Sequence, residues 1–464
     1  MSTFHLMVCG WTLAERRSAV RDNQEIATTV RRSILRLGVA LVAVSAFALP
    51  AQAQKKHSGN ADELYNQGIK YASLGQWPQA IEAYKQAIRL KPKFAEPYNN
   101  LGNVYTNLGQ YQEAIQAYHQ AIQIKPDLAE AYHNLGTTYT RLGRYQEAVE
   151  ASRQALRLQP ALAEASYNLG YALAQLGRSY EAVQAYRSAV AAKSGYPDAL
   201  FGLAEAYRKL GQYQEAAEAY KQAIQARPAN AEYQNFLGLA YSGLGRQQDA
   251  VEAFKQAVRI KPDYLDAQNN LGSAYFHLGR YDEAKAAYEQ SIRIKPDCAT
   301  AYYSLGLVYE KLGRNREAVD AYGKAIAADS HLIDALQRLG IAYGKLGQHQ
   351  RAVDALQQAI KSKPRDADLY YNLGVAYDRL NQQPEAVQSY ERAVMLDPRH
   401  AEAHYNLGLS YLKLGNKSAA ARECEALKKL DVNLANELSI RIQKVLSPPS
   451  SEVSNKPLGL TRVR

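Results

Sequence analysis

Residues 95–128 read AEPYNNLGNVYTNLGQYQEAIQAYHQAIQIKPDL, and most of this pattern returns in the next 34 residues, which begin at Ala129. Positions 4, 7, 8 and 11 of the segment carry apolar or small residues, namely Tyr98, Leu101, Gly102 and Tyr105. These positions share one face of a helix that has 3.6 residues per turn. The first part of the segment therefore predicts an amphipathic helix, named helix A below.

The same spacing runs from Ala61 to Leu434 as eleven repeats of 34 residues without insertion or deletion. Position 8 is Gly in ten repeats, position 11 is Tyr in ten, position 20 is Ala in all eleven and position 32 is Pro in eight. Small residues at 8 and 20 allow two backbones to approach closely, so we expect helix A to pair with a second helix, helix B. Position 15, Gly in ten repeats and Asn381 in the other, suits the left-handed residue that ends a helix.

This spacing of Leu-Gly, Tyr, Ala and Pro resembles the tetratricopeptide repeat, a 34-residue helix-turn-helix. The resemblance implies an all-α fold, a right-handed superhelical solenoid of eleven helix-turn-helix repeats with a C-terminal capping helix. The repeats are similar to those of O-linked N-acetylglucosamine transferase. Only nineteen residues follow Val445, so we expect the catalytic domain of that enzyme to be absent.

The chain divides into five predicted segments. Residues 1–53 are an N-terminal extension with a signal peptide, residues 54–60 a linker and residues 61–434 the repeat array. An amphipathic capping helix over 435–446 is followed by a Ser/Pro-rich tail, 447–464, which we expect to be disordered.

The N-terminal extension has the pattern of an export signal. Residues 31–36 include three Arg, a mostly apolar run follows over 37–49, and residues 51–53 read AQA, which predicts cleavage between Ala53 and Gln54. A run of this length is shorter than the roughly 20 residues that span a bilayer, so we expect no integral membrane span after cleavage. The alternative is a membrane anchor or a buried helix. The pattern leaves open the Sec and twin-arginine routes, and it predicts a periplasmic or secreted protein.

Packing of helix A leaves positions 2, 6, 9 and 13 on the opposite side, called the A-helix face below. In tetratricopeptide proteins this face lines the concave groove that binds peptides or partner helices. Position 6 is Asn in seven repeats, and a row of amides can donate to and accept from a peptide backbone; the predicted binding residues are Asn66, Asn100, Asn134, Asn168, Asn270, Asn372 and Asn406. The alternative is a solvated consensus residue.

Two further rows lie on the A-helix face. Position 9 is apolar in the last four repeats, which predicts either an anchor for a partner or partial burial between neighbouring A helices; these residues are Leu307, Ile341, Val375 and Leu409. Position 13 is basic in six repeats, which fits either an acidic ligand or the compensation of a helix dipole; these residues are Arg141, Lys209, Lys311, Lys345, Arg379 and Lys413.

Motifs that carry chemistry are missing from the sequence. There is no P-loop, no G-x-S-x-G element and no dinucleotide fingerprint, so we expect no enzyme activity and no cofactor. His400 and His404 are four residues apart, but HAEAH lacks the H-E-x-x-H order and no Cys or His lies nearby in sequence, so we expect two surface histidines and no metal site.

The net charge of +11 is a weak argument for a nucleic-acid partner, because acidic position 2 and basic position 31 both suit helix dipoles. We expect no nucleic-acid binding. The sequence predicts a non-catalytic scaffold that binds peptides or partner proteins in the groove, within a complex of the cell envelope. The alternative is an accessory subunit that presents the substrate of an envelope enzyme, such as a glycosyltransferase or a polysaccharide-export complex.

Overall fold

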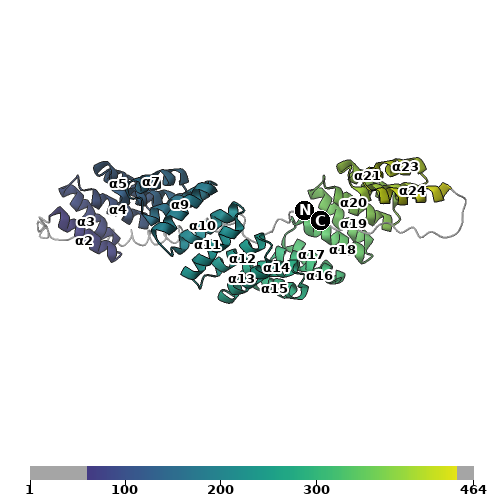
Figure 1. Cartoon of the computed structure of the whole chain (residues 1–464), viewed down its shortest axis with the longest axis horizontal. Coiled ribbons are helices and arrows are strands. Elements are labelled where there is room, and N and C mark those ends of the chain that lie inside the picture. The colour runs from purple at the N-terminus through teal and green to yellow at the C-terminus, as the bar shows by residue number, and fades with distance from the viewer. Residues whose placement is uncertain (1–59, 447–464) are drawn as a thin grey trace, which may run out of the picture. The chain divides into compact units, whose positions relative to one another are not determined.

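A computed structural model describes residues 60–446, and the elements found there are helices without strands (Figure 1). These residues belong to two compact units, 60–261 and 262–446. The predicted signal peptide, its cleavage site and the C-terminal tail lie outside the described residues, as does most of the predicted linker. The all-α architecture of consecutive helix pairs confirms the predicted fold class.

Helices of the N-terminal unit alternate between A and B in chain order. The A helices are α2 (Ala61–Ser73), α4 (Ala95–Asn107), α6 (Ala129–Arg141), α8 (Ala163–Gln175), α10 (Pro197–Lys209) and α12 (Ala231–Gly243). The B helices are α3 (Trp77–Leu90), α5 (Tyr111–Ile124), α7 (Tyr145–Leu158), α9 (Ser179–Ala192), α11 (Tyr213–Ala226) and α13 (Gln247–Ile260).

Helices of the C-terminal unit follow the same alternation and end with one more helix. The A helices are α14 (Leu265–His277), α16 (Ala299–Lys311), α18 (Ile333–Lys345), α20 (Ala367–Arg379) and α22 (Ala401–Lys413). The B helices are α15 (Tyr281–Ile294), α17 (Asn315–Ala328), α19 (His349–Ser362), α21 (Gln383–Leu396) and α23 (Lys417–Leu427), and the last helix is α24 (Val432–Leu446).

The turn from helix A to helix B depends on one left-handed residue. Gly109 has φ +73°, and the only non-Gly residue with positive φ in the described residues is Asn381, at φ +60°. The Gln110 amide then donates to the Tyr105 carbonyl at 2.8 Å, which satisfies a carbonyl at the end of α4. The expected role of position 15 is confirmed.

In most repeats the helix pair closes around a glycine at position 8. A Cβ atom on Gly102 would lie 2.5 Å from Cε1 of Tyr118, the aromatic residue at position 24 of the same repeat. Tyr118 is 1% exposed and Ala114, at position 20, is fully buried. The missing Cβ therefore lets the Tyr118 ring pack directly against helix A, as close packing of protein interiors requires.

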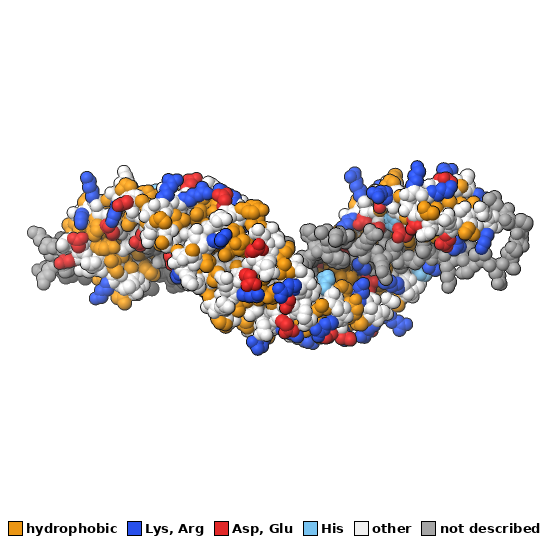
Figure 2. Space-filling view, in the orientation of Figure 1, with side chains coloured by type: hydrophobic (Ala, Val, Ile, Leu, Met, Phe, Trp, Pro, Cys, Tyr) orange, Lys and Arg blue, Asp and Glu red, His pale blue; other side chains and the backbone are white. Residues whose placement is uncertain are grey.

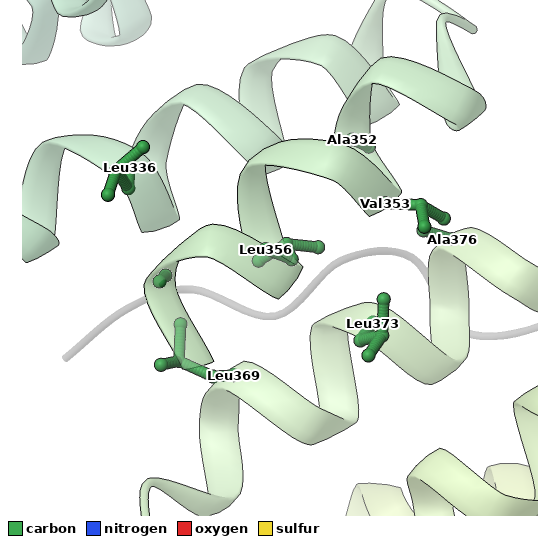
Figure 3. Close-up of a cluster of buried hydrophobic side chains, with 8 residues drawn as sticks. Leu336, Ala352, Val353, Leu356, Leu369, Leu373 and Ala376 are labelled. Atoms are coloured by element: carbon green, nitrogen blue, oxygen red, sulfur yellow. The ribbon is translucent and has the colours of Figure 1, made fainter. Parts of the chain in front are cut away.

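Within each unit, successive helix pairs share a core. Figure 3 shows one segment of this core in the C-terminal unit, where Leu336 from α18, Val353 and Leu356 from α19, and Leu369 and Leu373 from α20 form a buried cluster. Because each pair packs mainly against its neighbours in sequence, the core of each unit extends from one repeat to the next.

Both ends of the stack are closed by sequence changes. Positions 3, 7 and 10 of the first repeat are Glu63, Gln67 and Lys70, all exposed, where inner repeats carry mostly buried residues. At the other end, α24 packs against α22 and α23, and its Leu438 covers Gly408. The helix begins at Val432, before the expected residue 435, because the Asp431 carboxylate accepts hydrogen bonds from the first-turn amides.

Candidate functional site

The A-helix face is the candidate binding surface, and its position-6 amides connect neighbouring A helices. In three repeats the Asn Nδ2 donates to the position-5 side chain of the preceding repeat: Asn100 to Tyr65 Oη at 3.1 Å, Asn134 to Asn99 Oδ1 at 3.1 Å, and Asn406 to Tyr371 Oη at 3.2 Å. Asn168 Nδ2 donates instead to Thr137 Oγ1, at 2.7 Å. These four amides are therefore partly used within the protein, a role that sequence analysis missed.

The other three predicted asparagines differ in exposure. Asn66 is exposed on α2, whereas Asn270 and Asn372 are buried. The Oδ1 atoms of Asn372 and Asn406 are also inaccessible, at residue exposures of 1% and 2%. The predicted row is consequently not a continuous exposed ladder of amides. The expectation of a solvated consensus residue is equally wrong for the buried members.

The expected apolar strip is also interrupted. Ile341 and Val375 are buried, at 2% and 1% exposure, and this corrects the prediction of an unbroken apolar surface at these two positions. Val375 belongs to the core cluster of Tyr371 and Tyr390. Leu307 and Leu409 are part-buried and pack against neighbouring clusters. The alternative of burial between A helices accounts for these contacts.

Position 12 contributes carboxylates that sequence analysis did not single out. Glu310 Oε1 accepts from Lys345 Nζ at 2.8 Å, and Glu310 Oε2 lies 3.5 Å from Nη1 of Arg338. Tyr322 Oη donates to the same carboxylate at 2.6 Å, and burial followed by the Glu310 charge raises the pKa of Tyr322 well above its usual value. The Glu310 side chain is 7% exposed, so it depends on these partners.

A similar cluster recurs two repeats later. Asp378, with a side chain only 3% exposed, pairs with Lys413 and accepts from Gln383 Nε2 at 2.7 Å. In both clusters an acid at position 12 meets a base at position 13 of the next repeat. That 35-residue spacing was the signal in the sequence that could have found them.

Position 13 is the exposed edge of the A-helix face. It is exposed in every described A helix, at Ser73, Asn107, Arg141, Gln175, Lys209, Gly243, His277, Lys311, Lys345, Arg379 and Lys413. Lys311 and Arg379 have no ion-pair partner within residues 60–446. This edge, unlike positions 6 and 9, is exposed in both units.

Other basic residues are used in contacts at the ends of repeats. Position 2 pairs with position 31 of the same repeat at N–O distances of 2.9–3.7 Å; these pairs include Asp62–Lys91, Glu96–Lys125, Glu164–Lys193, Asp198–Arg227 and Asp334–Lys363. Such exposed pairs contribute little stability. They do neutralise charge locally, and Figure 2 shows Lys/Arg and Asp/Glu side chains intermixed over the visible surface.

His400 and His404 are buried, which corrects the expectation of surface histidines. His404 Nδ1 lies 2.6 Å from Glu423 and its Nε2 lies 3.1 Å from the Pro398 carbonyl, so both nitrogens must donate. The Glu423 hydrogen bond raises the pKa of His404 accordingly. Within the described residues, no three His, Cys, Asp or Glu side chains gather as a metal site would require.

Two shallow pockets lie away from the A-helix face, at equivalent places in two repeats of the C-terminal unit. One, of about 480 Å³, is bordered by Tyr302, Leu305 and Tyr309; the other, of about 500 Å³, is bordered by Tyr370, Leu373 and Tyr377. Their walls also include helix-B side chains that already pair with one another, such as Asp320 with Lys324. None of the helices within residues 60–446 combines the length and hydropathy needed to cross a membrane.

Comparisons with solved structures find similar repeats. YrrB, described as a tetratricopeptide protein with an unusual peptide-binding site, is 26% identical over 40% of this chain and 97% of its own, with a TM-score of 0.38. MamA is 33% identical over 35% and 95%, with a TM-score of 0.34. Yeast Tom70 is 15% identical over 84% and 97%, with a TM-score of 0.37. No curated protein sequence matches the chain.

Family models cover nearly the whole array. The model of the cilia and flagella-associated protein 70 C-terminal domain, itself composed of tetratricopeptide repeats, matches residues 12–263. Two tetratricopeptide repeat models match residues 263–331, 338–398 and 384–431. With these matches and the helix pairs described above, the chain belongs to the tetratricopeptide repeat family.

Proposed function

We propose that this protein is a non-catalytic scaffold that holds peptides or partner proteins on the A-helix face. The observation that carries the proposal is the exposed position-13 edge, which repeats once per helix pair. Neighbouring helices pack roughly 8–10 Å apart, so the edge offers contact points at regular intervals to an extended or helical partner.

Packing of the face supports the same function. Position-6 amides and position-12 carboxylates hold neighbouring A helices in register, for example Asn406 on Tyr371 and Glu310 on Lys345. A surface held in this way loses little further entropy when a partner binds, which favours affinity. The family assignment agrees with a scaffold, since tetratricopeptide arrays serve protein interaction.

The proposed location is the cell envelope. It rests on the sequence pattern of residues 31–53, with its Arg-rich start, apolar run and AQA site. Fractionation of the native host followed by N-terminal sequencing tests this directly. A mature protein that starts at Gln54 in the periplasm or the medium supports the location, and an intact N-terminus in the cytosolic fraction refutes it.

Site-specific photocrosslinking in the native host tests the scaffold function. A photoreactive residue is placed at Asn107 or His277 on the position-13 edge, or at the exposed control residues Tyr180 on α9 and Met395 on α21. We expect one defined partner to crosslink from the edge positions and not from the controls. Equal labelling from edge and control positions would contradict the proposed face. Co-purification of an active envelope enzyme with that partner would assign the chain to the accessory-subunit role.

A further inference from the structure

We propose that the partner segment held by the C-terminal unit is an extended stretch with two carboxylates six residues apart, bound by Lys311 and Arg379. The inference rests on the scaffold function proposed above and adds the chemistry of the ligand. Three features of the A-helix face carry it: a run of bases at position 13, the neutralisation of every second one, and the spacing of the remaining two.

Four consecutive repeats carry a base at position 13, and two of these bases are already paired within the protein. Lys345 bonds Glu310, and Lys413 pairs with the buried Asp378. Lys311 and Arg379, which alternate with them along the unit, have no carboxylate partner in residues 60–446 and are exposed. Exposed bases without a partner can pair with an incoming anion at low desolvation cost.

Two acids on the A helices of this unit already have basic partners. Glu310 has Arg338 as a second partner, and the position-2 acid Asp334 pairs with Lys363. Asp368 lies 3.4 Å from the imidazole of His400. These acids lie at the opposite end of the A helices or within the position-12 clusters. An anionic segment along the position-13 edge therefore meets two available cations and no free carboxylate at position 13.

Spacing sets the pattern of the ligand. Lys311 on α16 and Arg379 on α20 are two repeats apart, and two steps at the 8–10 Å typical of packed helices separate their helix axes by roughly 16–20 Å. Six residues of an extended chain cover about 20 Å at ~3.3 Å per residue. Residues i and i+6 also lie on the same side in a β-strand, which has a period of two, and in polyproline II, which has a period of three.

The experiment uses the full chain and three fluorescent Ser/Ala/Thr peptides of 14 residues. One carries Glu at i and i+6, one carries Glu at i and i+3, and one carries Lys at i and i+6. Affinities are measured by fluorescence anisotropy at low and high salt. The test variant is K311Q/R379Q. The matched control is K361Q/R365Q, which removes one exposed Lys and one exposed Arg at the end of α19.

We expect the i,i+6 Glu peptide to bind most tightly, and the test variant to weaken it on the order of tenfold, as two exposed ion pairs would. The control variant should leave the affinity unchanged, and high salt should weaken binding. In the charge-swapped variant K311E/R379E, preference should reverse to the i,i+6 Lys peptide. This reversal separates a defined pair of contacts from general attraction to a basic protein.

Three results would overturn the inference: equal affinity for the two Glu spacings, equal loss in the test and control variants, or no reversal in the swapped variant. If the peptides show one of these results but the edge positions still crosslink to a defined partner in the host, the proposed ligand is wrong and the scaffold function is still supported. Failure of the crosslinking experiment as well refutes both proposals. The two failures are thus distinguishable.

Discussion

Substitution of Gly374 by Ala tests whether the position-8 glycine is required by packing. In an exposed helix Gly→Ala stabilises by up to about 1 kcal/mol. Here a Cβ would lie 2.6 Å from Cε1 and 2.7 Å from Cδ1 of Tyr390, whereas carbon atoms in contact prefer about 3.5–4.0 Å. Tyr390 is fully buried in the core.

The clash should exceed the gain in helix propensity. Overpacking of a core costs about 1–3 kcal/mol, and three ring atoms at or below 3.0 Å favour the upper end, so we expect a net loss of about 2 kcal/mol. Gly323→Ala is the matched control, because Gly323 is also helical and has no atom within 4 Å of its would-be Cβ. That variant should gain stability.

Hydrogen exchange of the α20 and α21 amides is the appropriate assay, because long repeat arrays need not unfold in one step. Gly374→Ala should lower protection there, and Gly323→Ala should raise protection in α17. In a Tyr390→Ala background the Gly374→Ala change should become neutral or stabilising, since the clash is gone. Unchanged or increased protection in the single Gly374→Ala variant would refute the packing argument.

Three further outcomes are expected. The Glu423 hydrogen bond raises the pKa of His404 in the folded protein above about 6.5, so the stability that this pair contributes should be complete below that pH and be lost as pH rises through the folded pKa. An NMR titration of the imidazole measures the pKa, and hydrogen exchange in α22 at pH 5.5 and 8.5 measures the change in stability. A pKa at or below 6.5 would contradict the prediction. Asp431→Ala removes the N-cap of α24, so it should lower the free energy of unfolding by about 1 kcal/mol and make α24 more sensitive to limited proteolysis. Unchanged resistance of α24 to the protease would argue against this role of Asp431. Lys413→Met should lower the free energy of unfolding by about 3 kcal/mol, because it leaves the buried Asp378 carboxylate without its cation. Adding Asp378→Asn should restore much of this stability, as measured by urea unfolding.

The sequence alone determined the helix pairs and the turn between helix A and helix B. Gly102 is needed because no Cβ fits between helix A and the Tyr118 ring, and Gly109 is needed because its φ is positive. Such requirements act within a single repeat, so they recur every 34 residues and can be recognised without coordinates.

Only the tertiary structure decided which face residues remain available to a partner. Ile341 and Lys345 lie four residues apart on one helix, yet the first is buried and the second is exposed and paired. Contacts of this kind link residues 35 positions apart, such as Asn406 with Tyr371, and depend on how closely neighbouring A helices approach. Helical periodicity assigns a side chain to a face, but burial on that face is set by the adjacent helix, which a single repeat does not specify.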